Sequence, residues 1–221
     1  MQSQLNNLYR RSGITKESCF HASRRLETHN NLSLWALSIL AFSLIVISLL
    51  LQIYATNEFV SENKKFLDFS ITAMSILALL ISVVVAKSNF SLKADNYRRQ
   101  AMEVNELRIS FRHLIEKDDA DQHKEKLYND KSAEYSGILT RNLVHDQIDF
   151  YVSSTEGIEH KYYYVKLFLT EFLGYVLIIA LSLSLLSWAS YGAYEKIILK
   201  VPQEQMSTES VAANKLLKTD S

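Results

Sequence analysis

The sequence predicts an all-α membrane protein, and three observations on its 221 residues lead to that fold class. Residues 32–54, 69–86 and 172–194 are apolar and contain no charged side chain. A helix needs about 20 such residues to cross a hydrocarbon core about 30 Å thick. One proline and five glycines leave the chain almost without helix breakers. The formal net charge is zero, and nearly all charged residues lie outside the three apolar stretches.

Residues 1–31 are polar and carry five basic side chains, so we expect a cytoplasmic amphipathic helix there and no cleavable signal peptide. The loop 55–68 has two lysines against three acidic residues, whereas basic residues follow quickly after the second stretch. The positive-inside rule therefore predicts a multi-pass protein with a cytoplasmic N-terminus and a two-helix transmembrane hairpin at 32–86. Cys19 is the only cysteine, which agrees with a reducing compartment for this end.

A third transmembrane helix is expected at 165–195. Lys196 and Lys200 follow it directly and favour the inside, so a re-entrant or interfacial helix is the alternative. The tail 196–221 is polar and holds the only proline, and we expect it to be disordered.

The segment 87–164 predicts a cytoplasmic helical hairpin. Its first helix should continue straight out of the second span, because no proline or glycine separates them. The apolar residues of this helix repeat with heptad spacing. This seam consists of Phe90, Ala94, Tyr97, Ala101, Val104, Phe111 and Ile115, with Arg108 interrupting it. The seam fits either packing on a second helix of the same chain, at 123–152, or a coiled-coil stalk that joins several chains.

His145 and Asp149 would lie one turn apart on that second helix, so the carboxylate could orient the imidazole. A structural pair and a pair that couples to a ligand or partner are both compatible with this spacing. The histidines show no metal-ligand spacing, and there is no glycine-rich phosphate loop or serine hydrolase motif. We therefore expect no enzyme, no catalytic residue, no metal and no cofactor.

Polar residues recur at helical spacing inside the spans. The second span carries Asp68, Thr72, Ser75 and Ser82 along one face, and the third carries Ser184 and Ser187. Small hydroxyl residues allow close helix packing, and the same stripes also suit the lining of a pore. Asp68 lies at the edge of its span, away from the midplane, which does not favour a proton-coupled transporter.

Three local patterns together resemble the SLATT family, the SMODS and SLOG-associating two-transmembrane effector domains of bacterial conflict systems. They are the basic helix 14–26 (ITKESCFHASRRL), Tyr97–Arg98 after the hairpin, and Tyr135-x-x-Ile138-Leu139 … His145-x-x-x-Asp149-Phe150. The resemblance covers most of residues 8–152. Val144 departs from it, because an asparagine is expected before the histidine. The third span is additional to the two-span core and fits a reverse-transcriptase-associated branch.

The resemblance implies an effector of antiviral defence in the bacterial inner membrane. Such a chain would form a homo-oligomer in the lipid bilayer and make a pore when a sensor from a neighbouring gene reports infection. That sensor would be a nucleotide-signalling enzyme or a reverse transcriptase, and no direct nucleic-acid binding is expected. The stripes would form the pore face or helix interface, and Arg108, His145 and Asp149 would transmit the signal. The alternative is a non-conducting membrane anchor or scaffold whose cytoplasmic helices recruit a soluble partner.

Overall fold

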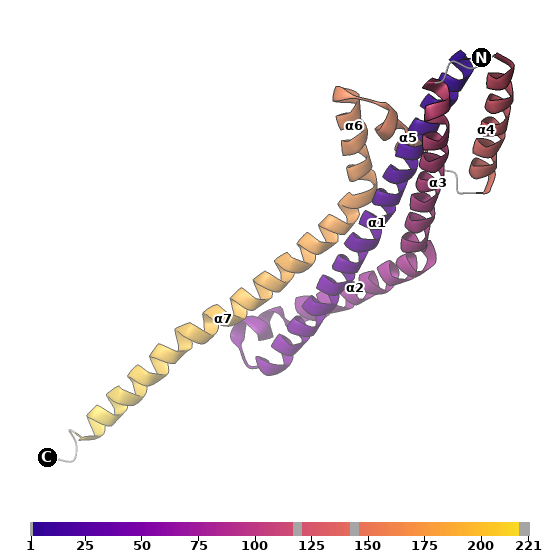
Figure 1. Ribbon diagram of the computed structural model, residues 1–221. Helices are drawn as coiled ribbons and strands as arrows, with labels where there is room; N and C mark the ends of the chain where they lie inside the picture. The colour runs from indigo at the N-terminus through magenta and orange to yellow at the C-terminus, as the bar shows by residue number, and fades with distance from the viewer. Residues whose placement is uncertain (1, 117–120, 142–145, 217–221) are drawn as a thin grey trace. The chain divides into compact units, whose positions relative to one another are not determined.

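The computed structural model describes residues 2–116, 121–141 and 146–216, and its regular structure in these ranges is entirely helical (Figure 1). The elements are α1 (Gln2–Ile53), α2 (Glu58–Ser88), α3 (Phe90–Glu116), α4 (Asp121–Arg141), α5 (Gln147–Ser154), α6 (Gly157–Leu167), the π-helical turn η1 (Phe168–Phe172) and α7 (Leu173–Leu216). The predicted all-α fold is confirmed.

Two compact units divide the chain. Residues 1–33 and 85–174 form one unit, which we call the polar module; residues 34–84 and those from Tyr175 onward form the other, the apolar module. Three helical stretches, Ser3–Ile53, Glu58–Ser110 and Gly157–Tyr194, are long and apolar enough to cross a membrane. Few side chains in their apolar parts are buried within the chain, as expected for helices that lipid surrounds.

The apolar module closes its hairpin through Asn57. The side-chain Oδ1 of this residue accepts hydrogen bonds from the amides of Phe59 (3.0 Å) and Val60 (3.4 Å), which caps the start of α2. Phe59 and Phe66 pack edge-on against Trp188 of α7, with ring centroids 5.0 and 5.6 Å apart. Small residues let α2 and α7 approach here: Ala189, Gly192 and Ala193 are all buried.

Asn89 separates α2 from α3, so the expected straight helix is wrong at this point. Its φ of +49° lies in the left-handed region, which asparagine tolerates better than most residues. The helix restarts at once, since the amide of Lys93 donates to the carbonyl of Asn89 at 3.0 Å. No proline or glycine marks the break, which is why the sequence did not reveal it.

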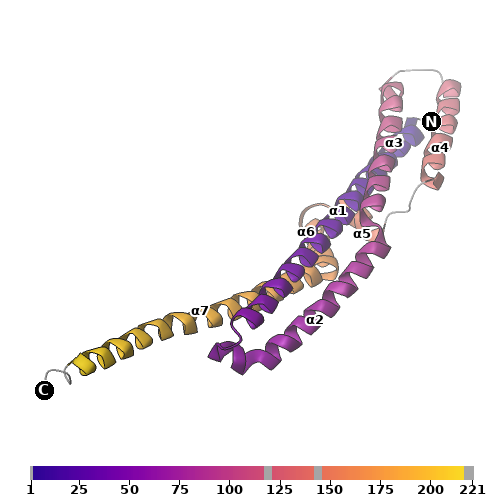
Figure 2. The ribbon, with the colours of Figure 1, turned by 90° about the horizontal axis from the view of Figure 1, so that it is seen from below.

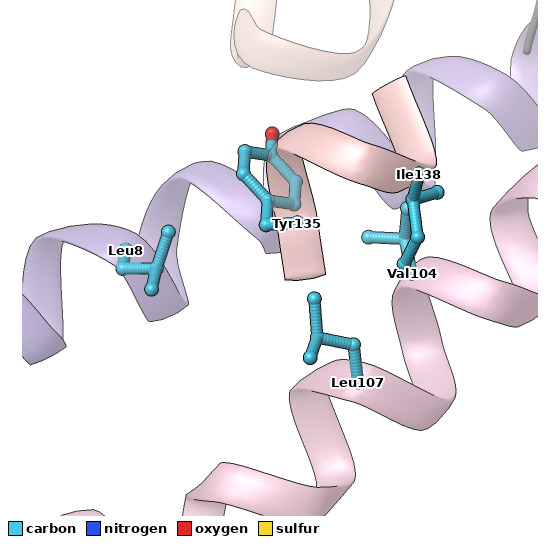
Figure 3. Close-up of a cluster of buried hydrophobic side chains, with 5 residues drawn as sticks. All are labelled: Leu8, Val104, Leu107, Tyr135 and Ile138. Carbon is cyan, nitrogen blue, oxygen red and sulfur yellow. The ribbon is translucent and has the colours of Figure 1, made fainter. Parts of the chain in front are cut away.

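The core of the polar module lies where the N-terminal part of α1 meets α3 and α4, and these three helices run side by side in both views (Figures 1 and 2). Figure 3 shows the buried side chains that meet there: Leu8, Val104, Leu107, Tyr135 and Ile138. Of the seam residues, Ala94, Tyr97, Ala101 and Val104 are buried within this one chain, and Phe90 is half-buried. Packing inside the chain therefore accounts for them without a stalk.

The N-terminal segment is part of the long helix α1. It is continuous with the first span in α1, and its buried face consists mainly of small residues, Ser12, Ser18, Cys19, Ala22 and Ser23. Two hydroxyl contacts of 2.6 Å fix this face, from Thr15 Oγ1 to the Tyr135 hydroxyl and from Ser18 Oγ to Ser153 Oγ. Small side chains let α4 and α5 come this close to α1.

The single helix expected at 123–152 is two helices, α4 and α5. Asp146 precedes α5 in an extended conformation, with φ −68° and ψ 153°. A second turn at Gly157, with φ +67°, then starts α6, which packs on α5 by stacking Tyr163 on Tyr151 at 4.9 Å.

The tail 196–221 is expected to be disordered, but α7 continues as a helix through Leu216; residues 217–221 lie outside the described residues. Glutamate, glutamine, alanine, lysine and leucine between residues 204 and 216 favour helix even though the segment is polar.

Candidate functional site

Arg25 of α1 gathers three carboxylates from other elements, and with His29 they make up what we call the Arg25 cluster. The Nε and Nη2 of Arg25 donate to the two carboxylate oxygens of Asp149 in α5, at 3.1 and 2.9 Å. Nη1 donates to Glu171 Oε1 in η1 at 2.8 Å, and Nη2 also pairs with Asp146. The Arg25 side chain is 10% exposed and that of Asp149 only 1%. One guanidinium thus joins α1, α5 and η1.

His29, one turn after Arg25, completes the cluster. Its Nε2 lies 2.8 Å from Glu171 Oε2, so Glu171 bridges the two residues of α1. The imidazole stacks on Phe90 at 5.1 Å and is tilted against Phe172 at 4.6 Å. Glu171 and Phe172 both lie in the π-helical turn, and such wide turns are often found at functional positions.

The Arg25 cluster has more acidic than permanently basic groups, three carboxylates against one guanidinium. Burial raises the pKa of Asp149 from its ordinary 3.8 to about 6, although the charge and hydrogen bonds of Arg25 act in the opposite direction. The cluster can therefore take up a proton close to neutral pH. Within the described ranges, no group of three or more histidine, cysteine, aspartate or glutamate side chains is placed to hold a metal ion.

One family of known proteins matches most of the chain. The family described as SMODS and SLOG-associating 2TM effector domain family 5 matches residues 1–192. The chain belongs to this SLATT family. No curated protein and no solved structure matches it. The family is a two-transmembrane effector domain associated with conflict systems, a helical membrane domain that is not a known enzyme family. The match in this SLATT chain extends into α7, so it includes most of the third apolar stretch.

The predicted pairing of His145 with Asp149 stays a prediction in this SLATT chain, but the helical spacing behind it is interrupted. Helical spacing between them requires one continuous helix, whereas α5 begins only at Gln147, after the extended Asp146. His145 itself lies outside the described residues. The partner of Asp149 is Arg25, 124 positions earlier in the chain. Asp149 remains a candidate for signal coupling, now through a different neighbour.

Arg108 joins α3 to α1 by a cation–π contact. Its guanidinium carbon lies 4.1 Å from the centre of the Tyr9 ring. Gly13 lies beside this side chain, and a Cβ there would make an ordinary van der Waals contact with the guanidinium at 3.4 Å. The Nε of Arg108 is buried and has no hydrogen-bond partner in the part of the chain that the structure describes. Its role in signal transmission stays a prediction.

The hydroxyl stripes of the SLATT spans face away from the chain's own packing. Asp68, Thr72, Ser75, Ser82, Ser184 and Ser187 are all exposed. The buried face of α2 consists instead of Val60, Leu67, Ser70, Met74 and Ile81. Thr72 and Ser75 donate to carbonyls of their own helix, at 3.0 and 2.8 Å. The stripes therefore do not serve contacts inside this chain, and their role in a pore or between chains remains to be tested.

Sequence reasoning missed most of the Arg25 cluster. In the sequence, Arg25 is one of five basic residues before the first apolar stretch, and His29 has no other histidine at ligand spacing. The one available hint was the family resemblance, whose basic helix contains Arg25 and whose last motif contains Asp149. The structure shows that these two motifs meet in space.

Proposed function

We propose that this SLATT chain is an effector that assembles in the bacterial inner membrane and permeabilises it when a partner sensor is triggered. This proposal is based mainly on the exposed polar stripe of α2, Asp68, Thr72, Ser75 and Ser82. Polar side chains in a span are rarely turned toward lipid, so a stripe that its own chain leaves open favours contact with further copies or with water. Copies arranged around an axis would place Ser75 and Ser82, and with them Ser184 and Ser187, along the permeation path.

The Arg25 cluster suits the transmission of a signal to the spans. Along the chain, α1 runs from Arg25 directly into the first span, and η1 runs from Glu171 directly into α7. A partner that binds one arrangement of α5 better than another would shift the population of assemblies between closed and open forms. The polar module is then cytoplasmic, and its partner is a nucleotide-signalling enzyme or a reverse transcriptase encoded nearby.

Substitution of the stripe tests the proposal. Ser75→Leu and Ser82→Leu together should abolish ion conductance in triggered cells while cross-linking shows that the oligomer still assembles. A matched control replaces Ile76 and Leu80 by alanine, since these residues are comparably exposed (55% and 56%) but lie on a different face of α2. The control should conduct like the wild type.

A non-conducting anchor that recruits a soluble partner is the second candidate, because the exposed stripe also suits contacts between chains that enclose no path. In that case the serine variant either behaves like the wild type or loses assembly. Conductance that persists in the assembled serine variant would contradict the pore.

A further inference from the structure

A cavity of about 370 Å³ lies in the polar module beside the Arg25 cluster. Apolar side chains from α1, α5, α6 and η1 form most of its wall: Leu32, Val152, Tyr164, Leu167, Phe168 and Phe172. The polar side consists of four residues of α1 and one of α5: His21, Arg24, Arg25, Thr28 and Asp149. Its volume lies in the range of small-molecule pockets, and its lining is apolar on one side and polar on the other.

Two of the wall residues give the depth of the cavity relative to the membrane. Leu32 is the first residue of the first apolar stretch, and Phe172 is the first residue of the third. Both helices continue from these residues into their apolar stretches without interruption. The cavity therefore lies where the helices enter the bilayer, at the level of lipid headgroups.

Arg24 and Arg25 both line the cavity, but only Arg25 is paired with carboxylates. Arg25 is compensated by Asp149 and Glu171, and both oxygens of Asp149 are taken up by Arg25. Arg24 is exposed and makes no ion pair with any residue that the structure describes. Burial, and then the charge of Arg24, lower the pKa of His21, so its ring is neutral near pH 7 and offers one N–H donor. Among the residues that line the cavity, Arg24 is therefore the cationic group that no described carboxylate pairs with.

We propose that this cavity binds an anionic phospholipid, whose phosphate pairs with Arg24 and whose acyl chain begins against the apolar wall of Val152, Leu167 and Phe168. Basic pockets beside transmembrane helices take anionic headgroups in this way. The wall argues for a lipid and against a free phosphate, because a soluble anion would leave the apolar side chains without a partner. Thr28 Oγ1 donates to the carbonyl of Arg24 at 2.8 Å and marks the polar side of the cavity. The proposal goes beyond the pore, since lipid binding here does not require conductance.

Native mass spectrometry of the full chain in detergent, titrated with phosphatidylglycerol or phosphatidylcholine, tests this assignment. We expect saturable binding of phosphatidylglycerol and much weaker binding of phosphatidylcholine. Arg24→Gln should weaken phosphatidylglycerol binding about fivefold, which corresponds to one charge at the membrane surface. Thr28→Trp keeps the charge but fills the cavity, and it should also reduce binding.

Arg98→Gln is the matched control, because Arg98 is an exposed arginine of the same module that lies outside this cavity. Equal weakening by Arg98→Gln and Arg24→Gln would mean general attraction between basic residues and anionic lipid, and would overturn the site. Displacement of the lipid by inorganic phosphate at millimolar concentration would overturn the lipid in favour of a soluble anion. Unchanged binding of phosphatidylglycerol to Arg24→Gln would overturn both the lipid site and the soluble-anion alternative. None of these outcomes affects the test of the stripe, which measures conductance.

Discussion

Arg25 and Asp149 are joined by two parallel hydrogen bonds, from Nε to Oδ1 at 3.1 Å and from Nη2 to Oδ2 at 2.9 Å. This two-point geometry between a planar guanidinium and a carboxylate makes charge-assisted hydrogen bonds, which are stronger than those between neutral groups. Because the Asp149 side chain is 1% exposed, water does not substitute for either partner. The pair fastens α5 to the helix that enters the first span.

Removal of Arg25 should destabilise the polar module severely. Arg25→Ala leaves three carboxylates without their shared cation, and loss of one partner of a buried pair costs about 3–5 kcal/mol. Arg24→Ala is the matched control, because the neighbouring arginine is exposed and the change should stay within about 0.5 kcal/mol. Thermal unfolding of both variants in lipid-free detergent measures the difference, and equal Tm values would contradict the structural role of Arg25.

Removal of the Asp149 carboxyl group should change how the stability of the polar module depends on pH. Burial raises the pKa of Asp149 from 3.8 to about 6, so in that window the native chain holds a proton that the unfolded chain has released. Its stability therefore falls as the pH rises from about 4 to about 6, and Asp149→Asn removes this fall. The Tm advantage of the wild type over Asp149→Asn should shrink between about pH 4.5 and pH 7.5. A constant difference would be incompatible with the raised pKa.

Gly192 sets how closely α7 approaches α2. A Cβ at this position would lie 2.3 Å from the Phe59 ring, so Gly192→Ala must displace that ring and its edge contact with Trp188. Overpacking of this kind costs about 1–3 kcal/mol. Gly174→Ala is the control in the same helix, because nothing lies within 4 Å of its Cβ. We expect a lower Tm for Gly192→Ala than for Gly174→Ala, and the reverse order would refute this packing.

The sequence was sufficient for the spans but not for the Arg25 cluster, and the reason is physical. A bilayer imposes its demand on every residue of a span, so 32–54, 69–86 and 172–194 are recognisable from local composition alone. The pairing of Arg25 with Asp149 depends on how distant helices pack, and no local spacing encodes it.

Two helix breaks were missed for a related reason. Asn89 and Asp146 interrupt expected helices without any proline or glycine beside them. Tertiary packing can override local helix preference at such positions. The periodicity of Ala94, Tyr97, Ala101 and Val104, by contrast, predicted correctly which side of α3 is buried, although it did not identify α1 as a neighbour.

Membrane potential is the measurement that tests the central claim most directly. Cells that express the chain alone, and cells that also express its genomic neighbours, are challenged with phage while a voltage-sensitive dye reports the potential. The account predicts depolarisation only when the neighbours are present and triggered. A membrane that stays polarised while the chain still binds its neighbour would contradict it and favour the scaffold.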